Sequence, residues 1–484
     1  MIDLPSASGA RLAGDDYQHV LTWIYALKLL LVDGGVTRIE FEVDNAGNVD
    51  DLAVHRSDEP TLYHQIKFVV SQKDPLTHEW FITPPKTAQR SPLHRFYESY
   101  LELGARGGTP PEMALHTNRL PAAGDPILAL VSGTDCKVVP RLSTARPGSA
   151  AGKVRTEWAE HLGISEAELL RFLGSLAIRC GRDAFDDLQE QCAWAMRAVG
   201  FRADTATLLA VVGALRELIK KGVRELNADA VRTLADTLQL SAGPPRATLL
   251  VQALAADPWP ETATASVDWV DLFEGEHASA RRQLKNPFHW NDRLKPDLVR
   301  AVERIRRARL TEVDVRGAMR LAVGLLVGQQ LSEVAGFKVA AIGREGEWSS
   351  SAERETVAVE RKLVDIGLGD DLAVALAISQ PIRDDVASHI RAQKLPVGTL
   401  IVISPPVGPS RDAIKSPAEG LGLAAATSAA LREDTTRHGQ RVHLFQACPL
   451  PFAIMVGHFW NRMPPTVIYE DLGPAAGYTP TFTI

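Results

Sequence analysis

Several features that would place this sequence in a membrane or outside the cell are missing from it. No stretch approaches the ~18 consecutive apolar residues that a membrane-spanning helix needs. Residues 1–14 lack a basic segment followed by an apolar one, so we expect no signal peptide. The cysteines have no CxxC spacing, which argues against a zinc site or a disulfide framework. We therefore predict a cytoplasmic protein whose cysteines are reduced core residues: Cys136, Cys180, Cys192 and Cys448.

The sequence also lacks an excess of positive charge and the common signatures of hydrolases. Its formal net charge of −6 gives no overall attraction for nucleic acid, although local basic patches decide where DNA is bound. It contains no HExxH, GxxxxGK[ST] or GxSxG motif, and its 13 histidines have no metal-ligand spacing. Zinc is therefore not an expected cofactor.

What is present is a long chain of soluble, α/β character. A chain of 484 residues exceeds what one hydrophobic core organises, so two or three domains are expected. Helix and strand patterns alternate over residues 1–150, become helical over 151–260, and alternate again over 265–484. Residues 145–158 have the composition of a linker, and clusters of glycine and proline at 243–245 and 257–260 indicate a second boundary.

Short apolar segments in both outer regions predict the strands. The N-terminal region has a helical pattern over residues 14–33, a second near 92–103, and strand patterns over 38–43, 51–55, 63–70 and 112–117. In the C-terminal region, strands almost free of polar residues predict a mostly parallel sheet covered by helices, as in Rossmann-like halves. These strands are expected at 310–315, 336–342, 372–379, 399–404 and 441–447.

Polar residues on the early strands form the pattern of a metal-dependent phosphodiesterase. Side chains two apart share a strand face, so Gln65 and Lys67 project together while Ile66 points into the core. Asp51 begins the preceding strand, with Asp50 beside it, and Glu42 ends the strand before that. Phosphodiester hydrolysis at neutral pH needs a divalent cation such as Mg²⁺ or Mn²⁺, and Mg²⁺ prefers one or two carboxylates.

The roles follow from this chemistry. Asp51 would hold the metal, assisted by Asp50 or Glu42, with Gln65 supplying a neutral oxygen where related sites use Glu; Ile66 completes the predicted metal-binding set. Lys67 would orient the attacking water and stabilise charge on the phosphate. The alternative is structural: Asp50 and Asp51 cap a turn, and the QxK segment is a solvated strand edge.

A resemblance to a known family favours the catalytic interpretation. The nuclease of SAVED-domain effectors in CBASS antiphage systems, which has a restriction-endonuclease-like fold of the PD-(D/E)xK type, is similar to this region. The matching segments are Gly14–Asp15–Asp16–Tyr17–Gln18, Ile39-x-Phe41–Glu42, Val49–Asp50–Asp51, Tyr63–His64–Gln65–Ile66–Lys67, and Leu115–His116–Thr117–Asn118–Arg119 with Asp125–Pro126.

The last 220 residues resemble the SAVED sensor domain, a fusion of two CARF-like halves. The matching segments are Val315-x-Gly317-x-Met319–Arg320–Leu321, 343–348, 373–379, His443–Leu444–Phe445-x-Ala447-x-Pro449, Gly457-x-x-Trp460–Asn461, Tyr469–Glu470 and Tyr478-x-Pro480-x-Phe482. The resemblance implies that a cyclic oligonucleotide messenger binds here, drives homo-oligomerisation and switches on cleavage of double-stranded DNA.

The residues themselves also predict an anion-binding edge in this domain. In open α/β sheets ligands lie beyond the carboxyl ends of the strands, where helix N-termini attract anions. Trp348 would stack a base from a polar loop. The other candidates fall at strand-to-helix corners, each with an ordinary turn as its alternative: Arg316, Gly317, Arg320, Ser379, Gln380, Ser404, Pro405, Cys448 and Pro449. His443, Phe445 and Trp460 are interpreted as core residues.

Basic residues could serve the DNA substrate in two places. Close to the nuclease motif in sequence, four residues are placed to follow a DNA backbone: Lys73, Lys86, Arg90 and Arg95. The arginine run over 300–309 is interpreted as the solvated face of an amphipathic helix, with contact to DNA or to another subunit as the alternative. Two other functions stay open: a nucleotide-sensing protein whose nuclease fold no longer cuts, and a constitutive restriction-type nuclease.

Overall fold

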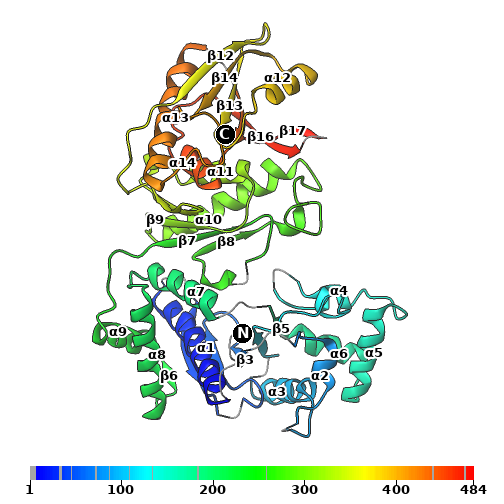
Figure 1. Cartoon of the computed structure of the whole chain (residues 1–484). Coiled ribbons are helices and arrows are strands. Elements are labelled where there is room, and N and C mark those ends of the chain that lie inside the picture. The colour runs from blue at the N-terminus through cyan, green and yellow to red at the C-terminus, as the bar shows by residue number, and fades with distance from the viewer. Residues whose placement is uncertain are drawn as a thin grey trace. The chain divides into compact units, whose positions relative to one another are not determined.

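The computed structural model divides the chain into two compact units, Met1–Pro245 and Arg246–Ile484 (Figure 1). It describes residues 7–31, 35–44, 46–70, 74–86, 88–107, 110–132, 135–181, 185–257, 259–438, 441–473 and 476–484. The boundary coincides with the predicted break at 243–245. Residues 151–245 belong to the first unit, so the helical region does not stand apart as a separate segment. None of the described helices is both long and apolar enough to span a membrane.

The first unit contains the strands that were expected and two more. Its elements are α1 (Ala7–Leu27), η1 (Lys28–Leu30), β1 (Val36–Phe41), β2 (Leu52–Arg56), β3 (Leu62–Lys67), α2 (His78–Ile82), α3 (Pro92–Gly107), β4 (Glu112–Thr117), η2 (Leu128–Leu130), α4 (Val139–Leu142), α5 (Ala150–Leu162), α6 (Glu166–Gly174), β5 (Leu176–Arg179), α7 (Phe185–Ala198), α8 (Thr205–Lys220), β6 (Glu225–Leu226) and α9 (Ala228–Thr237). The linker predicted over 145–158 is wrong from residue 150 onward, because Ser149 caps α5 by accepting a hydrogen bond from the Gly152 N–H.

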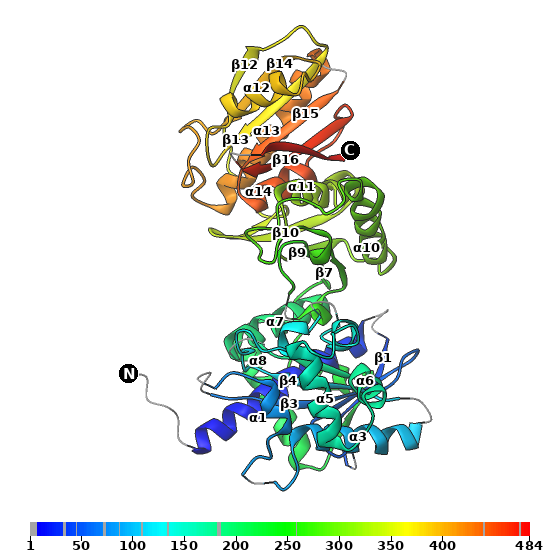
Figure 2. The same ribbon diagram turned by 90° about the vertical axis from the view of Figure 1, so that its right-hand side faces the viewer.

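These strands form one mixed sheet in the order β5-β4-β3-β2-β1-β6. β2 runs antiparallel to both β1 and β3, whereas β3, β4 and β5 run parallel to one another. Large apolar side chains of α2, α3, α5 and α6 pack against β4 in a single core that includes Phe81, Phe96, Trp158 and Phe172. α1 lies against β1, α7 and α8 (Figure 2). The sheet is therefore covered by helices, and β2 and β3 are neighbours near its middle.

The second unit is built from two sheets. Its elements are β7 (Ala247–Gln252), η3 (Pro260–Thr262), β8 (Ala265–Asp268), η4 (Val270–Leu272), η5 (Trp290–Leu294), α10 (Lys295–Arg307), β9 (Glu312–Arg316), α11 (Leu321–Gln330), η6 (Glu333–Ala335), β10 (Lys338–Gly343), β11 (Gly346–Ser349), β12 (Glu360–Asp365), β13 (Asp371–Ala377), α12 (Arg383–Ala392), β14 (Val397–Ser404), α13 (Pro417–His438), β15 (Val442–Ala447), α14 (Leu450–His458), β16 (Thr466–Gly473) and β17 (Gly477–Thr483).

The sheet orders are β11-β10-β9-β7-β8 and β12-β14-β13-β15-β16-β17. Both have parallel centres, as predicted, and antiparallel strands only at edges. The expected start of this domain at residue 265 is too late, because β7 already belongs to the first of these sheets. All six residues of β7 are buried.

Helices α11 and α14 join the two sheets through a close contact between main chains. A Cβ atom on Gly328 would lie 1.9 Å from the Ile454 carbonyl oxygen, and one on Gly457 would lie 2.1 Å from the Leu325 carbonyl oxygen. Gly324, a turn before Gly328, faces Leu450 at the start of α14, so the two helices run parallel and begin at the same end. One core cluster accordingly includes residues of both sheets.

The arginine run lies in and just after α10 and has the predicted amphipathic form. Leu298, Ala301, Val302 and Ile305 are buried on one side of the helix. The arginines are exposed, and several pair with acidic residues of the same helix, as Arg300 does with Asp297. The arginines thus lie on the exposed face of an amphipathic helix, as predicted, and contact with DNA or another subunit stays an untested alternative.

Candidate functional site

Asp51 lies immediately before β2, where the main chain is held from two sides. Its carbonyl oxygen accepts hydrogen bonds from the Glu42 N–H at 3.2 Å and from the Gln18 side chain at 3.3 Å. Glu42 directly follows β1, and Gln18 belongs to α1. The start of β2 is thus fixed against both the neighbouring strand and the helix behind it.

The Asp51 carboxylate points at β3. One of its oxygens, Oδ2, accepts the main-chain N–H of Ile66 at 2.6 Å and also a hydrogen bond from the Gln65 side-chain amide. Antiparallel pairing of Leu52 with His64 sets this register. The structure therefore brings Asp51, Gln65 and Ile66 together as the sequence predicted. Gln65 and Ile66 are buried, and Asp51 is half-buried.

Burial raises the pKa of the Asp51 carboxyl above its usual range. The hydrogen bond from Ile66, the positive charge of Lys67 and the hydrogen bond from Gln65 all act in the opposite direction. The charge of Asp50 adds to the rise. Among the described residues, Lys67 is the cation that acts on this partly desolvated carboxylate, and a bound metal ion would stabilise such a group.

The other predicted residues lie at the rim of this cluster. Lys67, Asp50 and Glu42 are exposed. Glu42 has a φ of 51°, which is uncommon for a non-glycine residue and turns the chain out of β1. The Val43 N–H then donates to the Asp50 carbonyl at 2.6 Å. Lys67 and Asp50 act on Asp51 through their charge, whereas no hydrogen bond of the Glu42 side chain is described.

The sequence did not assign a role to Gln18 or Asn118, and both support the site. Asn118, just beyond β4, exchanges two hydrogen bonds with the main chain of Val69, at 2.8 and 2.7 Å. These bonds extend the pairing of β3 with β4 past Lys67. They therefore fix the main chain from which the Lys67 side chain projects. Gln18 received no role because its partner is a main-chain oxygen, which no side-chain pattern reveals.

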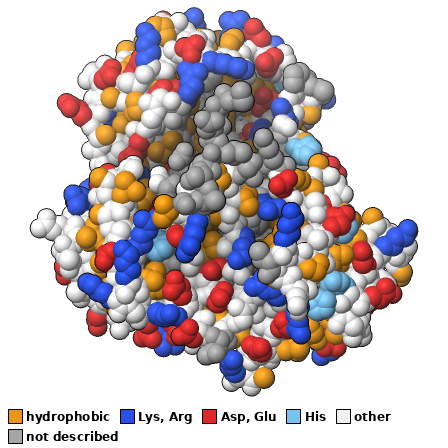
Figure 3. All heavy atoms as spheres, turned by 60° about the horizontal axis from the view of Figure 1, so that its bottom comes forward, with side chains coloured by type: hydrophobic (Ala, Val, Ile, Leu, Met, Phe, Trp, Pro, Cys, Tyr) orange, Lys and Arg blue, Asp and Glu red, His pale blue; other side chains and the backbone are white. Residues whose placement is uncertain are grey.

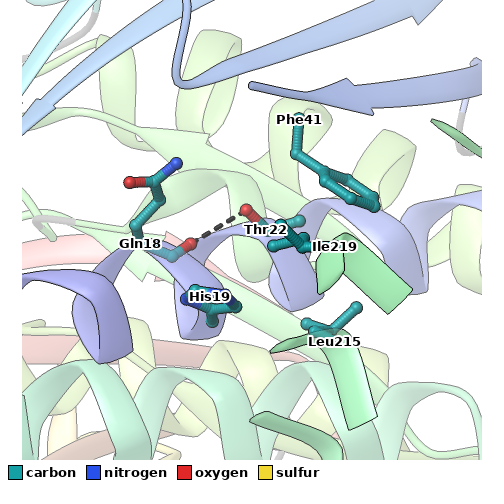
Figure 4. Close-up of a pocket in the computed structure, with 6 residues that line it drawn as sticks. All are labelled: Gln18, His19, Thr22, Phe41, Leu215 and Ile219. Atoms are coloured by element: carbon teal, nitrogen blue, oxygen red, sulfur yellow. Dashed lines mark hydrogen bonds between the residues drawn. The ribbon is translucent and has the colours of Figure 1, made fainter. Parts of the chain in front are cut away.

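A small pocket lies beside Gln18 (Figure 4). It is lined by Gln18, His19 and Thr22 of α1, by Phe41 of β1, and by two residues of α8, Leu215 and Ile219. The Thr22 hydroxyl donates to the Gln18 carbonyl at 2.9 Å. With a largely apolar lining and scarcely room for one water, it is a packing gap between α1 and α8 and not a substrate site.

A second group of possible metal ligands, His78, Glu79 and Asp125, is already satisfied. Asp125 accepts the His78 N–H at 2.7 Å, the His78 ring at 2.9 Å, and two N–H groups of residues 127 and 128. Burial acts to raise the pKa of Asp125, but these hydrogen bonds outweigh it and lower the pKa. Asp125 therefore anchors α2 to the loop after β4, and its lone pairs are not available for an ion.

Three of the four residues predicted to follow DNA lie among the described residues. Lys86 is exposed, Arg90 pairs with Glu98, and Arg95 is half-buried at the start of α3. Lys73 lies outside the described residues. On the face seen in Figure 3, lysine and arginine side chains alternate with acidic ones, without one continuous basic patch.

In the second unit the predicted ligand residues gather where parallel strands end, a region we call the sensor edge: the carboxyl ends of β9, β10, β13, β14 and β15. Ala377 pairs with Ala447 and Leu376 with Ile403, so three corners adjoin. They are Ser379–Gln380, Ser404–Pro405 and Cys448–Pro449. The chain leaves β13 for β14 on one side of it and leaves the adjacent β15 for β16 on the other side, so the strand order reverses between them. The same reversal occurs between β7, which leads to β8, and β9, which leads to β10. Such switch points are where α/β sheets bind ligands.

Two of the predicted ligand residues are engaged internally. Arg316 donates to the Trp259 carbonyl at 3.1 Å and to the Thr262 hydroxyl at 2.8 Å. Gly317 has a φ of 114°, and a Cβ there would lie 2.1 Å from the Val251 carbonyl oxygen. Close packing of the main chain therefore requires glycine at position 317, whether or not a ligand binds there.

Arg320 is held by a buried carboxylate. Its guanidinium donates to Glu470 at 2.9 Å and to the Asp471 carbonyl at 2.8 Å, while Glu470 also accepts the Ala322 N–H at 3.0 Å. Burial raises the pKa of Glu470, and the charge of Arg320 opposes the rise. The predicted anion-binding arginine thus neutralises an internal carboxylate and ties the start of α11 to β16.

Comparison with known proteins identifies a family for most of the second unit. Residues 294–484 match the family model of SAVED, the SMODS-associated and fused to various effectors sensor domain. These residues are a SAVED domain. Over 490 residues the chain is 23% identical to CD-NTase-associated protein 4 of Enterobacter hormaechei subsp. hoffmannii (strain UCI 50), with 94% of this chain and 95% of that protein covered. The predicted recognition, a CBASS effector with a C-terminal SAVED sensor, is confirmed.

Solved structures of similar proteins span the same length. The Acinetobacter baumannii Cap4 SAVED/CARF-domain containing receptor with the cyclic trinucleotide 3′3′3′-cAAA has 15% identity and a TM-score of 0.47, with 99% of both chains covered. The Moraxella osloensis Cap4 receptor has 15% identity and a TM-score of 0.44, with 97% of this chain and 99% of that chain covered.

One prediction about the SAVED domain is wrong. Trp348 lies in β11 and not in a loop, and its side chain is 0% exposed. Its ring fills the space beside Gly420, where a Cβ atom would come within 2.0 Å of it. A tryptophan without exposed surface has no face on which to stack a base. His443, Phe445 and Trp460 are buried as predicted.

Proposed function

We propose that this chain is a metal-dependent DNA endonuclease whose cleavage is controlled by a cyclic oligonucleotide bound to its SAVED domain. The observation that carries the nuclease half is the hydrogen bond from the Ile66 N–H to the Asp51 carboxylate at 2.6 Å. It aligns a carboxylate with the QxK segment at the end of β3, and the charge of Lys67 reaches that carboxylate.

The donor set fits a hard divalent cation such as Mg²⁺ or Mn²⁺. Asp51 supplies a carboxylate, Gln65 an amide oxygen once its amide is turned, and Ile66 a main-chain carbonyl, all of which are oxygen ligands. The ion, when bound, offsets phosphate charge and lowers the pKa of a coordinated water. Only one carboxylate lies at the centre, with Asp50 at the rim, so we expect weak metal binding.

The remaining chemistry belongs to Lys67. Its ammonium group, exposed at the end of β3, can donate to a phosphate oxygen and orient the attacking water. The Asn118 bridge to Val69 holds the strand that carries it. Gln65 adds no charge, so Asp51 remains the main negative group facing the ion.

The sensing half rests on the SAVED match and on the sensor edge. Cyclic trinucleotides are the ligands of the Acinetobacter Cap4 receptors. In this chain, α11 and α14 begin side by side at the sensor edge, and helix N-termini attract phosphate groups. For a switch, the ligand must bind the active, oligomeric state more tightly than the inactive one. We propose double-stranded DNA as the substrate and a homo-oligomer as the active form.

The test uses the full chain with plasmid DNA and Mg²⁺, with and without a panel of cyclic di- and trinucleotides. Cleavage only with one ligand, abolished by Lys67→Ala or Asp51→Asn and retained in the exposed control Lys153→Ala, is the expected result. Ligand binding without cleavage would instead indicate a sensor that recruits a partner. Cleavage that needs no ligand would indicate a constitutive nuclease.

A further inference from the structure

The β10–β11 hairpin ends in a two-residue turn at the sensor edge. Gly343 and Gly346 are the last paired residues of the hairpin, so Arg344 and Glu345 form its turn. β10 runs parallel to β9, which brings this turn to the edge where β9 ends. The turn also faces the second half of the SAVED domain, because Arg344 donates to Asp412 at 2.7 Å.

The Glu345 carboxylate is enclosed and incompletely paired. Its side chain is 10% exposed, and Oε1 lies 3.4 Å from the Arg344 guanidinium, which is itself 65% exposed. Within the described residues, the other oxygen, Oε2, is buried without a hydrogen-bond partner. A buried acceptor without a hydrogen bond destabilises the fold, so such a group is retained where something else satisfies it.

An unpartnered donor lies beside this acceptor. The indole N–H of Trp348 is also buried without a partner among the described residues. Trp348 Nε1 and Glu345 Oε2 lie 3.0 and 3.2 Å from the position that a Cβ atom on Gly343 would take, and Pro451 of α14 closes the same space at 3.1 Å. We call this the Gly343 niche: one donor and one acceptor next to the first turn of α14.

We propose that Glu345 reads a base of the nucleotide ligand by accepting a hydrogen bond from its exocyclic amino group. The Trp348 N–H would donate to the ring nitrogen beside that amino group. Adenine offers an amino group next to an acceptor nitrogen, and so does cytosine, whereas uracil has no amino group. A carboxylate repels phosphate, so this niche selects the base while the helix N-termini take the phosphates. The inference rests on the proposed sensing function.

The position of Glu345 in the hairpin turn allows its carboxylate to turn toward a bound base. It lies in a turn between two glycines, so a change of its side-chain rotamer requires no movement of the strands. Its only described ion pair is with the neighbouring Arg344, which has Asp412 as a second partner. The Trp348 side chain has no exposed surface, and Gly420 excludes its ring from stacking. A ligand edge would therefore reach the indole N–H only after the Glu345 side chain, which lies against the same space, turns toward the ligand.

The experiment measures binding of the full chain to cyclic triadenylate, tricytidylate, triguanylate and triuridylate, and to a cyclic tri(purine riboside) that lacks the amino group of adenine. The variants are Glu345→Met, which has no acceptor, and Glu345→Gln, which keeps one. Glu347→Met, an exposed residue on the same hairpin, is the matched control, and thermal unfolding checks that all three variants fold.

The wild type and Glu347→Met should bind the amino-bearing ligand about ten- to a hundredfold more tightly than its amine-free analogue. Glu345→Met should bind the two alike, with its affinity for the amine-free analogue unchanged, and Glu345→Gln should fall between. An undiminished preference in Glu345→Met would overturn the inference. A wild type that binds these ligands but prefers triuridylate would also overturn it, whereas a wild type that binds none of the panel would remove the sensing function itself.

Discussion

The main-chain N–H of Ile66 donates to the carboxylate of Asp51 across two neighbouring strands, at 2.6 Å. The same oxygen also receives the Gln65 amide, so a single atom of Asp51 organises the site. A metal ion would compete with these donors for the carboxylate. How strongly the ion binds therefore depends on what stands at position 65.

Replacing Gln65 with Glu should strengthen metal binding. A second carboxylate beside Asp51 adds a charged oxygen ligand of the kind Mg²⁺ prefers. Without metal, the two carboxylates repel each other and destabilise the site, so the variant should melt lower in chelator and gain more from added Mn²⁺ than the wild type. Thermal unfolding at several Mn²⁺ concentrations measures this, with Gln65→Leu as the variant expected to gain nothing. A Glu variant that melts identically with and without Mn²⁺ would contradict a metal at this position.

The sequence was sufficient to predict this site because its parts are local in the chain. Asp51, Gln65 and Lys67 lie on two strands joined by a short connection, so alternation along each strand already places them on facing positions. The other early strands of the first unit were predicted for the same reason, whereas five strands of the second unit were predicted from runs almost free of polar residues. β5 and β6 were missed because strands of four and two residues are too short to carry a pattern. The sequence analysis also missed β7, β8, β11, β12, β16 and β17.

The sensor edge could be predicted only as a location. Strand ends are visible in the sequence, but the pairing of Arg320 with Glu470 joins residues 150 positions apart. The burial of Trp348 in β11 likewise depends on Gly420, which lies in α13. Whether a polar residue at a strand end faces a ligand or an internal partner is decided by such distant contacts.

Reversing the charge of Lys86 or Arg95 should weaken DNA binding. Both follow the nuclease motif closely in the sequence, and we propose that both contact phosphates of the bound duplex. Each lost phosphate contact should make the plot of log K against log salt less steep by about one. Binding of the Lys67→Ala chain to labelled duplex at several salt concentrations measures this. Lys362→Glu on β12 in the second unit is the control of equal charge. Equal affinities for all three variants would place the DNA elsewhere.

Replacing Gly328 with Ala should destabilise the SAVED domain. The new Cβ would meet the Ile454 carbonyl oxygen at 1.9 Å, and main-chain atoms cannot rotate away, so α11 and α14 must separate. We expect a loss of about 3 kcal/mol. Gly213→Ala in α8 is the control, since nothing lies within 4 Å of its Cβ position and alanine favours helix by roughly 1 kcal/mol. Thermal unfolding compares them, and equal melting temperatures would mean that the helices tolerate separation.

Replacing Arg320 with Met should leave Glu470 buried without its cation. Breaking a buried ion pair from one side costs about 3–5 kcal/mol, and the Ala322 N–H offsets little of this. The pKa of Glu470 is already raised by burial, and removal of Arg320 raises it further. A carboxyl whose folded-state pKa lies above its unfolded value favours the folded state more as the pH falls.

The instability of Arg320→Met should therefore be greatest at neutral pH and shrink as the pH falls through the raised pKa of Glu470. The double variant Arg320→Met with Glu470→Gln keeps an acceptor for Ala322 but carries no buried charge, so it should recover most of the stability and lose this pH dependence. Denaturant unfolding between pH 5 and 8 measures both. If Arg320→Met is as stable as the wild type and has instead lost affinity for cyclic oligonucleotides, Arg320 is a ligand residue and its contact with Glu470 is incidental.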